Sequence, residues 1–242
     1  NGAAPDEAKN PKIWVSDLKA GDKVDSVFQV TRINLREYEK GRFLTLRLGD
    51  RTGKISAVLW DRAEDVFRTI AEGDLVKVNG LVGKYQQETQ FKIHSIQRVE
   101  DSSQLEISDF LPVSSIPLPD LIQEFDSFLE TIEDHDYKTL LETFRRAEPY
   151  WSRFIQAPGA KRWHHPYLHG LFEHTLCVVK LCQRIADFYP EIDRDLLVTG
   201  AVFHDCGKMD ELVYDSYIDY STEGRLIGHL IQGTMMVERF IA

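Results

Sequence analysis

A histidine and an aspartate stand side by side at the end of an apolar run, as His204 and Asp205 within residues 199–208. Burying two such groups is costly, and metal coordination is the commonest way to offset that cost. A second histidine, His174, precedes this pair by one predicted helix, and a third, His229, follows it. These residue types at this spacing predict a metal site that can activate water.

Two antiparallel helices would bring His174, His204 and Asp205 to one point. Imidazole nitrogens with a carboxylate oxygen suit hard to borderline divalent cations, so we expect Mn first, with Mg, Fe, Ni or Zn as alternatives. Three protein ligands leave coordination positions for water, which is the arrangement that produces a hydroxide nucleophile near neutral pH.

Lys208 follows His204 by four residues, one helical turn, which suits it to stabilise negative charge on a phosphate oxygen. We therefore assign catalytic roles to Lys208 and Asp205, and expect Gly207 to let a ligand approach the backbone. His229 remains open between a second-metal ligand, a phosphate contact and a structural histidine. A ligand role and a structural role also stay open for His164, His165 and His169.

The distribution of charge along the 242 residues predicts two domains with different partners. Residues 11–100 hold 16 Lys and Arg against 13 Asp and Glu, whereas residues 101–242 hold 12 against 24. The front part is thus mildly basic within a chain of net charge −10. The alternative is that the asymmetry arises by chance.

No apolar run approaches the roughly 20 residues that span a bilayer, so we expect no membrane partner. The first residues lack the basic start and apolar core of a signal peptide, and we interpret residues 1–11 as a flexible leader. The three cysteines, Cys177, Cys182 and Cys206, show no CxxC spacing. This favours reduced thiols in a cytoplasmic protein.

Alternating, β-branched segments in the front part predict five strands, near residues 24–33, 43–48, 54–60, 75–82 and 89–96. Asp61 is suited to cap a short helix that reaches Ile70, between the third and fourth strands. This order is that of an OB-fold barrel, which we assign to residues 12–100.

Beyond a Pro- and Ser-containing linker at residues 101–118, the apolar spacing becomes helical. Helices are predicted near residues 137–144, 150–155, 168–189 and 196–204, with Pro190 ending the longest of them. The predicted fold class is therefore multidomain, with a five-stranded OB-fold barrel followed by an all-α domain at residues 119–242.

OB-folds bind single strands by stacking bases on aromatic side chains beside a basic groove. Phe28 and Trp60 are expected in the core instead. Single-stranded RNA or DNA is the expected partner, with weak sequence preference and strong salt dependence. The candidate contacts are Arg32, Arg36, Tyr38, Arg42, Phe43, Arg47 and Tyr85.

The sequence motifs around these predicted ligands resemble those of a known family. His174 followed by His204-Asp205 in the form HDxGK resembles the HD-domain metal-dependent phosphohydrolases, and residues 164–175, 200–208 and 223–229 resemble the YhaM-type bacterial 3′-5′ exoribonucleases, which carry an OB-fold before the HD domain. The resemblance implies metal binding by His174, His204 and Asp205, a catalytic Lys208, and a role for His229 in two-metal members. The family pattern continues with a histidine pair and an aspartate, so we expect the HD domain to be C-terminally incomplete. Whether residues after Ala242 complete the site, or the chemistry of the site is impaired, stays open.

The leading hypothesis is a metal-dependent 3′-5′ exonuclease that acts on single-stranded RNA, or DNA, with the barrel holding the strand. Two alternatives stay open: an HD-domain phosphohydrolase of small nucleotides, and a non-catalytic RNA-binding adaptor with an incomplete metal site. The oligomeric state is also open, and a homo-oligomer is one of the options.

Overall fold

The computed structural model describes residues 12–103 and 105–241, and its chain divides into two compact units between Phe110 and Leu111. The expected leader at residues 1–11 lies outside the described residues. None of the described helices is both long and apolar enough to cross a membrane.

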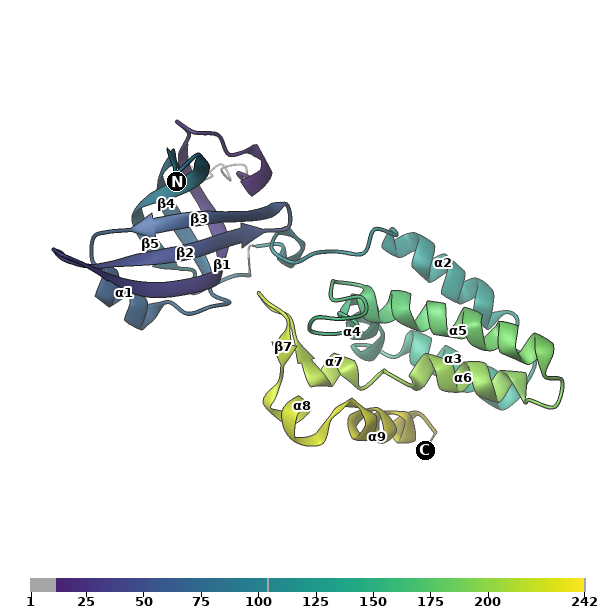
Figure 1. Cartoon of the computed structure of the whole chain (residues 1–242). Coiled ribbons are helices and arrows are strands. Elements are labelled where there is room, and N and C mark those ends of the chain that lie inside the picture. Colours follow the sequence, from purple (N-terminus) through teal and green to yellow (C-terminus); the bar gives the residue numbers. More distant parts are fainter. Residues whose placement is uncertain (1–11, 104, 242) are drawn as a thin grey trace, which may run out of the picture. The chain divides into compact units, whose positions relative to one another are not determined.

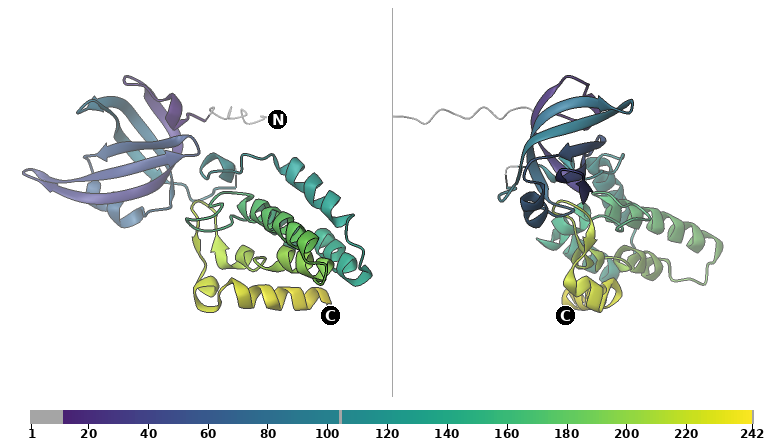
Figure 2. Two further views of the ribbon diagram at one scale, coloured as in Figure 1. Left: turned by 45° about the vertical axis from the view of Figure 1, so that its right-hand side comes forward. Right: turned by 60° about the vertical axis from the view of Figure 1, so that its left-hand side comes forward.

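The first unit is a closed barrel of five strands in the order β1-β2-β3-β5-β4. Figures 1 and 2 show these strands curling around one another. A 3₁₀ turn at Val15–Asp17 precedes the barrel. Its elements are β1 (Lys23–Tyr38), β2 (Gly41–Asp50), β3 (Gly53–Leu59), α1 (Ala63–Thr69), β4 (Leu75–Tyr85) and β5 (Glu88–Arg98). The predicted order of five strands, with a helix between the third and fourth, is confirmed.

The start of α1 differs from the prediction. The residue at its N-cap is Arg62, in the left-handed conformation with φ of 54°, and no side chain caps the helix. The capping role that we expected of Asp61 was therefore wrong, because the chain turns into the helix one residue later.

Alternation along β2 separates the barrel core from its outer surface. Leu44, Leu46 and Leu48 are buried, whereas Phe43 and Arg47 on the opposite face are partly or fully exposed. Inside the barrel, Phe28 packs edge-to-face on Phe91, and both rings are fully buried, so the predicted core position of Phe28 is confirmed.

A β-bulge lets β4 approach β5 closely. The register shifts between Asn79 and Gly80, and a Cβ on Gly80 would lie 2.2 Å from the carbonyl oxygen of Lys92. Only glycine fits such a contact without moving the backbone of the neighbouring strand, so this position helps the sheet to curl into a barrel.

The second unit is mainly helical. Its helices are α2 (Leu118–Leu129), α3 (His135–Arg146), α4 (Tyr150–Gln156), α5 (Gly170–Phe188), α6 (Arg194–Phe203), α7 (Lys208–Glu211), α8 (Thr222–Ile227) and α9 (His229–Ile241). The side chain of Asp193 accepts a hydrogen bond from the backbone N–H of Leu196 and so caps α6. An expected all-α architecture is thus correct in outline, but the unit also contains a two-stranded sheet of β6 (Leu212–Val213) and β7 (Asp219–Tyr220).

The segment that we interpreted as a linker, residues 101–118, carries some structure of its own. It contains a 3₁₀ turn at Ile107–Asp109, and the backbone N–H of Ser114 donates to the carbonyl oxygen of Leu168. The last residues of this segment are therefore anchored beside the start of α5.

The long helix α5 and its successor α6 lie side by side, with a short loop between them that reverses the chain direction (Figure 1). The core that they share with α2, α3 and α4 is rich in aromatic rings, among them Phe125, Trp151 and Phe172. This packing places the second turn of α5 opposite the last turn of α6.

Candidate metal centre

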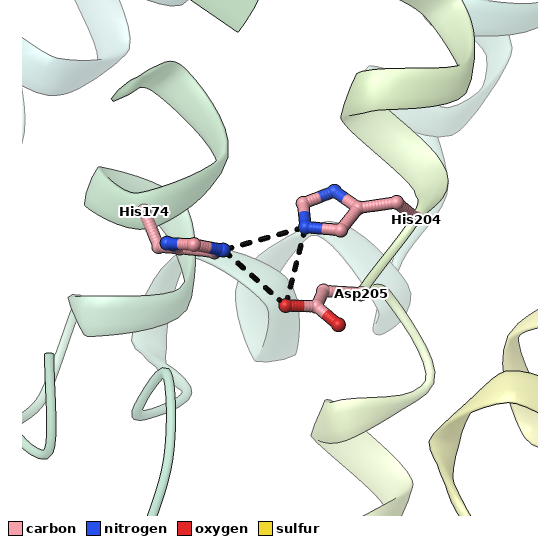
Figure 3. A group of neighbouring side chains, drawn as sticks. All are labelled: His174, His204 and Asp205. Atoms are coloured by element: carbon pink, nitrogen blue, oxygen red, sulfur yellow. Dashed lines mark hydrogen bonds and ion pairs between the residues drawn. The ribbon is translucent and has the colours of Figure 1, made fainter. Parts of the chain in front are cut away.

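Figure 3 shows that His174 projects from α5 toward His204 and Asp205, which follow the last residue of α6. Helices α5 and α6 pack against each other, and Thr175 on α5 and Val198 on α6 are both fully buried. His204 itself is exposed, and Asp205 retains only 7% of its surface. The cluster therefore opens to solvent on its histidine side.

Three potential ligand atoms in this cluster form a nearly equilateral triangle. The Nε2 atoms of His174 and His204 are 3.3 Å apart, and they lie 3.4 and 3.2 Å from Oδ2 of Asp205. A triangle of this size fits around a cation whose bonds to nitrogen and oxygen are about 2.0–2.2 Å long. Within residues 12–103 and 105–241, no other group of three or more His, Cys, Asp or Glu side chains brings its ligand atoms together in a way that could hold a metal ion.

The hydrogen bond at the far side of the His204 ring supports the same conclusion. Its Nδ1 atom lies 2.7 Å from the carbonyl oxygen of Ala201, which can only accept, so Nδ1 carries a proton. When the ring is protonated, Nε2 donates to the carboxylate of Asp205; when the ring is neutral, Nε2 presents a lone pair that can coordinate a cation. Fixing a metal-binding imidazole through its second nitrogen is common at protein metal sites.

Positive and polar groups gather around Asp205. Burial raises its pKa, but hydrogen bonds from His174, His204 and Lys208 outweigh burial and hold the pKa of Asp205 far below its usual value. The hydrogen bond to Asp205 in turn raises the pKa of His204. The aspartate is thus a carboxylate at any physiological pH, which suits it to hold a cation.

Lys208 contacts the carboxylate directly. Helix α6 ends at Phe203, and Lys208 opens the next short helix, α7, rather than continuing α6. Its ammonium nitrogen lies 2.7 Å from Asp205 Oδ2. Lys208 therefore reaches the cluster from a new helix, and not through the helical spacing from His204 on which its prediction depended.

His229, at the start of α9, approaches the other oxygen of the same carboxylate. Its Nε2 atom lies 3.4 Å from Asp205 Oδ1, while its Nδ1 lies 2.9 Å from Oε1 of Glu211. The backbone N–H of His229 also donates to that Glu211 oxygen, at 3.2 Å. Glu211, which is 9% exposed, thus orients His229, and the sequence analysis missed it because no motif or spacing marks this acid among its neighbours.

Gly207 has a different role from the one that we expected. A Cβ at this position would lie 2.0 Å from the carbonyl oxygen of His229 and 2.6 Å from the backbone nitrogen of Gly233. The partner that approaches its backbone is therefore α9, and not a ligand. This close contact sets His229 near Asp205.

The three remaining candidate histidines have separate surroundings. The ring of His165 lies 5.5 Å from that of His174, and its Nε2 is 3.6 Å from Glu173 Oε1. Burial lowers the pKa of His165. His169 precedes α5 and its Nδ1 lies 2.6 Å from the carbonyl oxygen of Ile155, a structural contact, whereas His164 is exposed.

On the barrel, three aromatic rings form an outer cluster. Trp60 stacks on Phe43 with ring centroids 4.5 Å apart, and Tyr38 meets both rings edge-on. Trp60 is 49% exposed, so its predicted core position was wrong. Trp60 is the first residue after the end of β3, and its ring packs on Phe43 of the outer cluster instead of entering the core.

The basic candidates on the barrel fall into two groups. Arg36 pairs with Phe43 of the aromatic cluster, and Arg32 pairs with Arg47 four residues further along β1 and β2. All three arginines are exposed. Arg42 is instead held by Glu37 at 2.8 Å and by Glu64 at 3.4 Å. Tyr85 is 59% exposed, at the turn that joins β4 and β5.

Comparison with known proteins matches both units. Residues 28–99 match the model of the OB-fold nucleic acid binding domain, and residues 171–241 match the HD domain. The chain is 36% identical over 189 residues to the 3′-5′ exoribonuclease YhaM of Bacillus pumilus, covering 78% of this chain and 59% of that protein. It is 32% identical over 213 residues to YhaM of Bacillus subtilis, covering 88% of this chain and 67% of that protein.

The chain belongs to the YhaM family. It spans between 59% and 67% of the length of these two relatives. Among solved structures it is similar to the second OB-fold domain of replication protein A from Methanococcus maripaludis, with 22% identity and a TM-score of 0.32, covering 38% of this chain and 97% of that domain. The HD domain of the YhaM family implies a divalent metal, and the triangle of His174, His204 and Asp205 fits one.

Proposed function

We propose that this protein is a metal-dependent 3′-5′ exonuclease that hydrolyses phosphodiester bonds of single-stranded RNA. The observation that carries the proposal is the convergence of His174 Nε2, His204 Nε2 and Asp205 Oδ2 within 3.4 Å of one another. The family relationship supports it, because the matched relatives are named 3′-5′ exoribonucleases.

Manganese is the metal that we propose for this triangle, since two imidazoles and a carboxylate are a mixed nitrogen and oxygen set that also accepts Mg, Fe, Ni or Zn. When bound, a divalent cation supplies Lewis-acid polarisation and lowers the pKa of water. His229 lies on the Oδ1 side of Asp205, where a second cation or a phosphate oxygen are both suitable partners.

Lys208 contributes positive charge at the cluster. Its ammonium group has three donors, of which one engages Asp205 Oδ2 and the others are available to a phosphate oxygen. A cation at the point where negative charge develops stabilises the transition state more than the bound substrate. We therefore assign Lys208 the role of phosphate contact.

The outer surface of β1, β2 and β3 is the surface that we propose for the strand. Its exposed arginines attract phosphates, and the Tyr38, Phe43 and Trp60 rings offer faces on which bases stack irrespective of sequence. The acidic character of residues 101–242 disfavours loose binding elsewhere on the helical unit.

The test is hydrolysis of single-stranded RNA labelled at either end, by protein first stripped with EDTA and then supplied with Mn. We expect release of labelled mononucleotide from 3′-labelled RNA before 5′-labelled RNA shortens appreciably, and no release by the Asp205→Asn variant. Hydrolysis of mononucleotides or dinucleotides, with RNA left intact, would instead identify a small-nucleotide phosphohydrolase. Absence of both activities in protein that holds metal would contradict the proposal.

A further inference from the structure

The segment before α5 carries an exposed tryptophan. Trp163 keeps 78% of its surface, and its neighbours Arg162 and His164 are also exposed. We call residues 158–169 the Trp163 loop. The Trp163 loop holds Lys161 and Arg162 but no acid, within a part of the chain where acids outnumber bases two to one.

The Trp163 loop is closed by backbone contacts. The backbone N–H groups of Gly159 and Tyr167 both donate to the carbonyl oxygen of His165, at 2.9 Å. A Cβ on Gly170 would lie 2.2 Å from that same oxygen, so the loop passes directly over the start of α5. These contacts hold the two ends of the loop in one position.

Two consecutive residues after the tryptophan adopt an unfavourable backbone conformation. His164 has φ of 56° and His165 has φ of 61°, the left-handed region that non-glycine residues rarely occupy. Strain of this kind persists only where surrounding contacts impose it, and it gathers at binding and catalytic sites. The pair turns the chain so that His165 faces inward while Trp163 stays in solvent.

This loop borders the metal centre. The ring of His165 lies 5.5 Å from the ring of His174, one of the three ligand residues. Trp163 is only two residues away from His165, so their Cα atoms are separated by no more than about 7 Å. The backbone that carries the exposed indole therefore lies within two residues of His165, whose ring faces a ligand of the site.

The Trp163 loop is also tied to the β6–β7 hairpin. Lys161 Nζ lies 2.5 Å from Asp219 Oδ1, and Arg225 shares that oxygen at 2.9 Å. Both cations also lie over the ring of Tyr220, at 5.8 and 5.6 Å from its centroid. Cations that pair with Asp219 anchor the loop, which leaves Arg162 and Trp163 facing solvent.

We propose that Trp163, assisted by the charge of Arg162, is a stacking platform for the 3′-terminal base of a single-stranded nucleic acid at the metal centre. The inference rests on the proposed exonuclease function and adds a second base-binding site to the one on the barrel. Stacking on a tryptophan accepts every base, so the platform holds the 3′ end in place without selecting a sequence.

The direct test is the fluorescence of RNA with 2-aminopurine as its 3′-terminal base, bound to EDTA-treated protein so that hydrolysis plays no part. We expect quenching on binding, loss of most of that quenching in Trp163→Ala, and its retention in Trp163→Phe. RNA with 2-aminopurine at the 5′ end should respond equally to wild type and Trp163→Ala. Phe188→Ala is the matched control, because Phe188 is equally exposed, at 79%, at the far end of α5.

The kinetic test compares RNA that carries a normal 3′-terminal nucleotide with RNA that carries an abasic one, in the presence of Mn. In wild type the abasic end should raise KM at least about fivefold, the lower end of one base stack. Trp163→Ala should raise KM for the normal RNA by the same factor, leave kcat within about twofold and abolish the discrimination. Trp60→Ala should weaken binding of both RNAs alike.

The outcomes separate the two proposals. Quenching that survives in Trp163→Ala, or that is absent in wild type, overturns the platform, whether or not RNA is hydrolysed. Quenching that depends on Trp163 in a protein that releases no mononucleotide with metal supports the platform and contradicts the exonuclease function.

Discussion

The ammonium group of Lys208 lies 2.7 Å from Oδ2 of Asp205, the oxygen that the Nε2 atoms of His174 and His204 also face. Oδ2 of Asp205 therefore pairs with the Lys208 ammonium group and is also one corner of the triangle that suits a metal. A divalent metal held by the triangle would share Asp205 Oδ2 with the Lys208 ammonium group, and this relationship leads to the first prediction.

Replacing Lys208 with methionine should separate metal binding from catalysis. The variant Lys208→Met keeps the apolar stem but removes the charge, so we expect kcat for mononucleotide release to fall about 10²–10³-fold. Affinity for Mn should not decrease, because a competitor for Asp205 Oδ2 has been removed. Calorimetric metal titration and kinetics on 3′-labelled RNA measure the two effects, and a loss of metal affinity would contradict this assignment of Lys208.

Removing one corner of the triangle should weaken metal binding without unfolding the protein. We expect His204→Ala to lower Mn affinity at least about tenfold, the scale lost when even a residue that only orients a ligand is removed. Because His204 is exposed, the thermal unfolding temperature of the His204→Ala variant should stay near that of wild type. His94→Ala, an exposed histidine on β5, is the control, and equal metal content in both variants would sink the assignment.

Glu211 should matter although it lies outside the triangle. It accepts hydrogen bonds from both Nδ1 and the backbone N–H of His229. The isosteric variant Glu211→Gln removes the negative charge that these hydrogen bonds hold, so the His229 ring is oriented less firmly. We expect the rate of mononucleotide release to fall about 10–100-fold. Glu223→Gln on α8 provides an exposed control, which should retain wild-type activity. A wild-type rate in Glu211→Gln would show that the orientation of His229 does not limit the reaction.

Two arginines on β2 should respond differently when RNA binding is measured at several salt concentrations. Arg47 is exposed on the same face of β2 as Phe43, whereas Arg42 is engaged by Glu37 and Glu64. Arg47→Ala should reduce the slope of log K against log salt by about 0.7, the value for one phosphate contact on a single strand. Arg42→Ala should change it less, and fluorescence anisotropy with a labelled oligonucleotide can decide whether this order holds.

Asp195 should contribute stability that depends on pH. Burial raises its pKa, but hydrogen bonds from the backbone of Asp134 and Glu133 and from Arg194 outweigh burial and lower the pKa below its ordinary 3.8. Its stabilising effect is therefore complete above the unfolded-state pKa and is lost as the pH falls through the lower folded-state value. Asp195→Asn should destabilise by about 2 kcal/mol at pH 7, and by progressively less below pH ~4. Urea unfolding of wild type and variant at pH 7 and below pH ~4 checks this. A difference in the free energy of unfolding that stays constant with pH would refute it.

The sequence by itself determined the local order of this protein. Strand alternation, turn residues and helical spacing are properties of neighbouring residues, and they sufficed for the five strands, the helix after β3 and the extents of α5 and α6 to within a few residues. The same local signals placed a histidine-aspartate pair where an apolar helix ends.

Only the tertiary structure decided which side chains meet. His174, Asp205 and His229 lie on separate elements, and their convergence depends on the packing of α5 on α6 and on the contact of Gly207 with α9. The contact of Glu211 with His229 and the exposure of Trp163 were decided in the same way. Each depends on distances across the fold, which no local periodicity specifies, because side-chain packing between elements is set by the whole core at once.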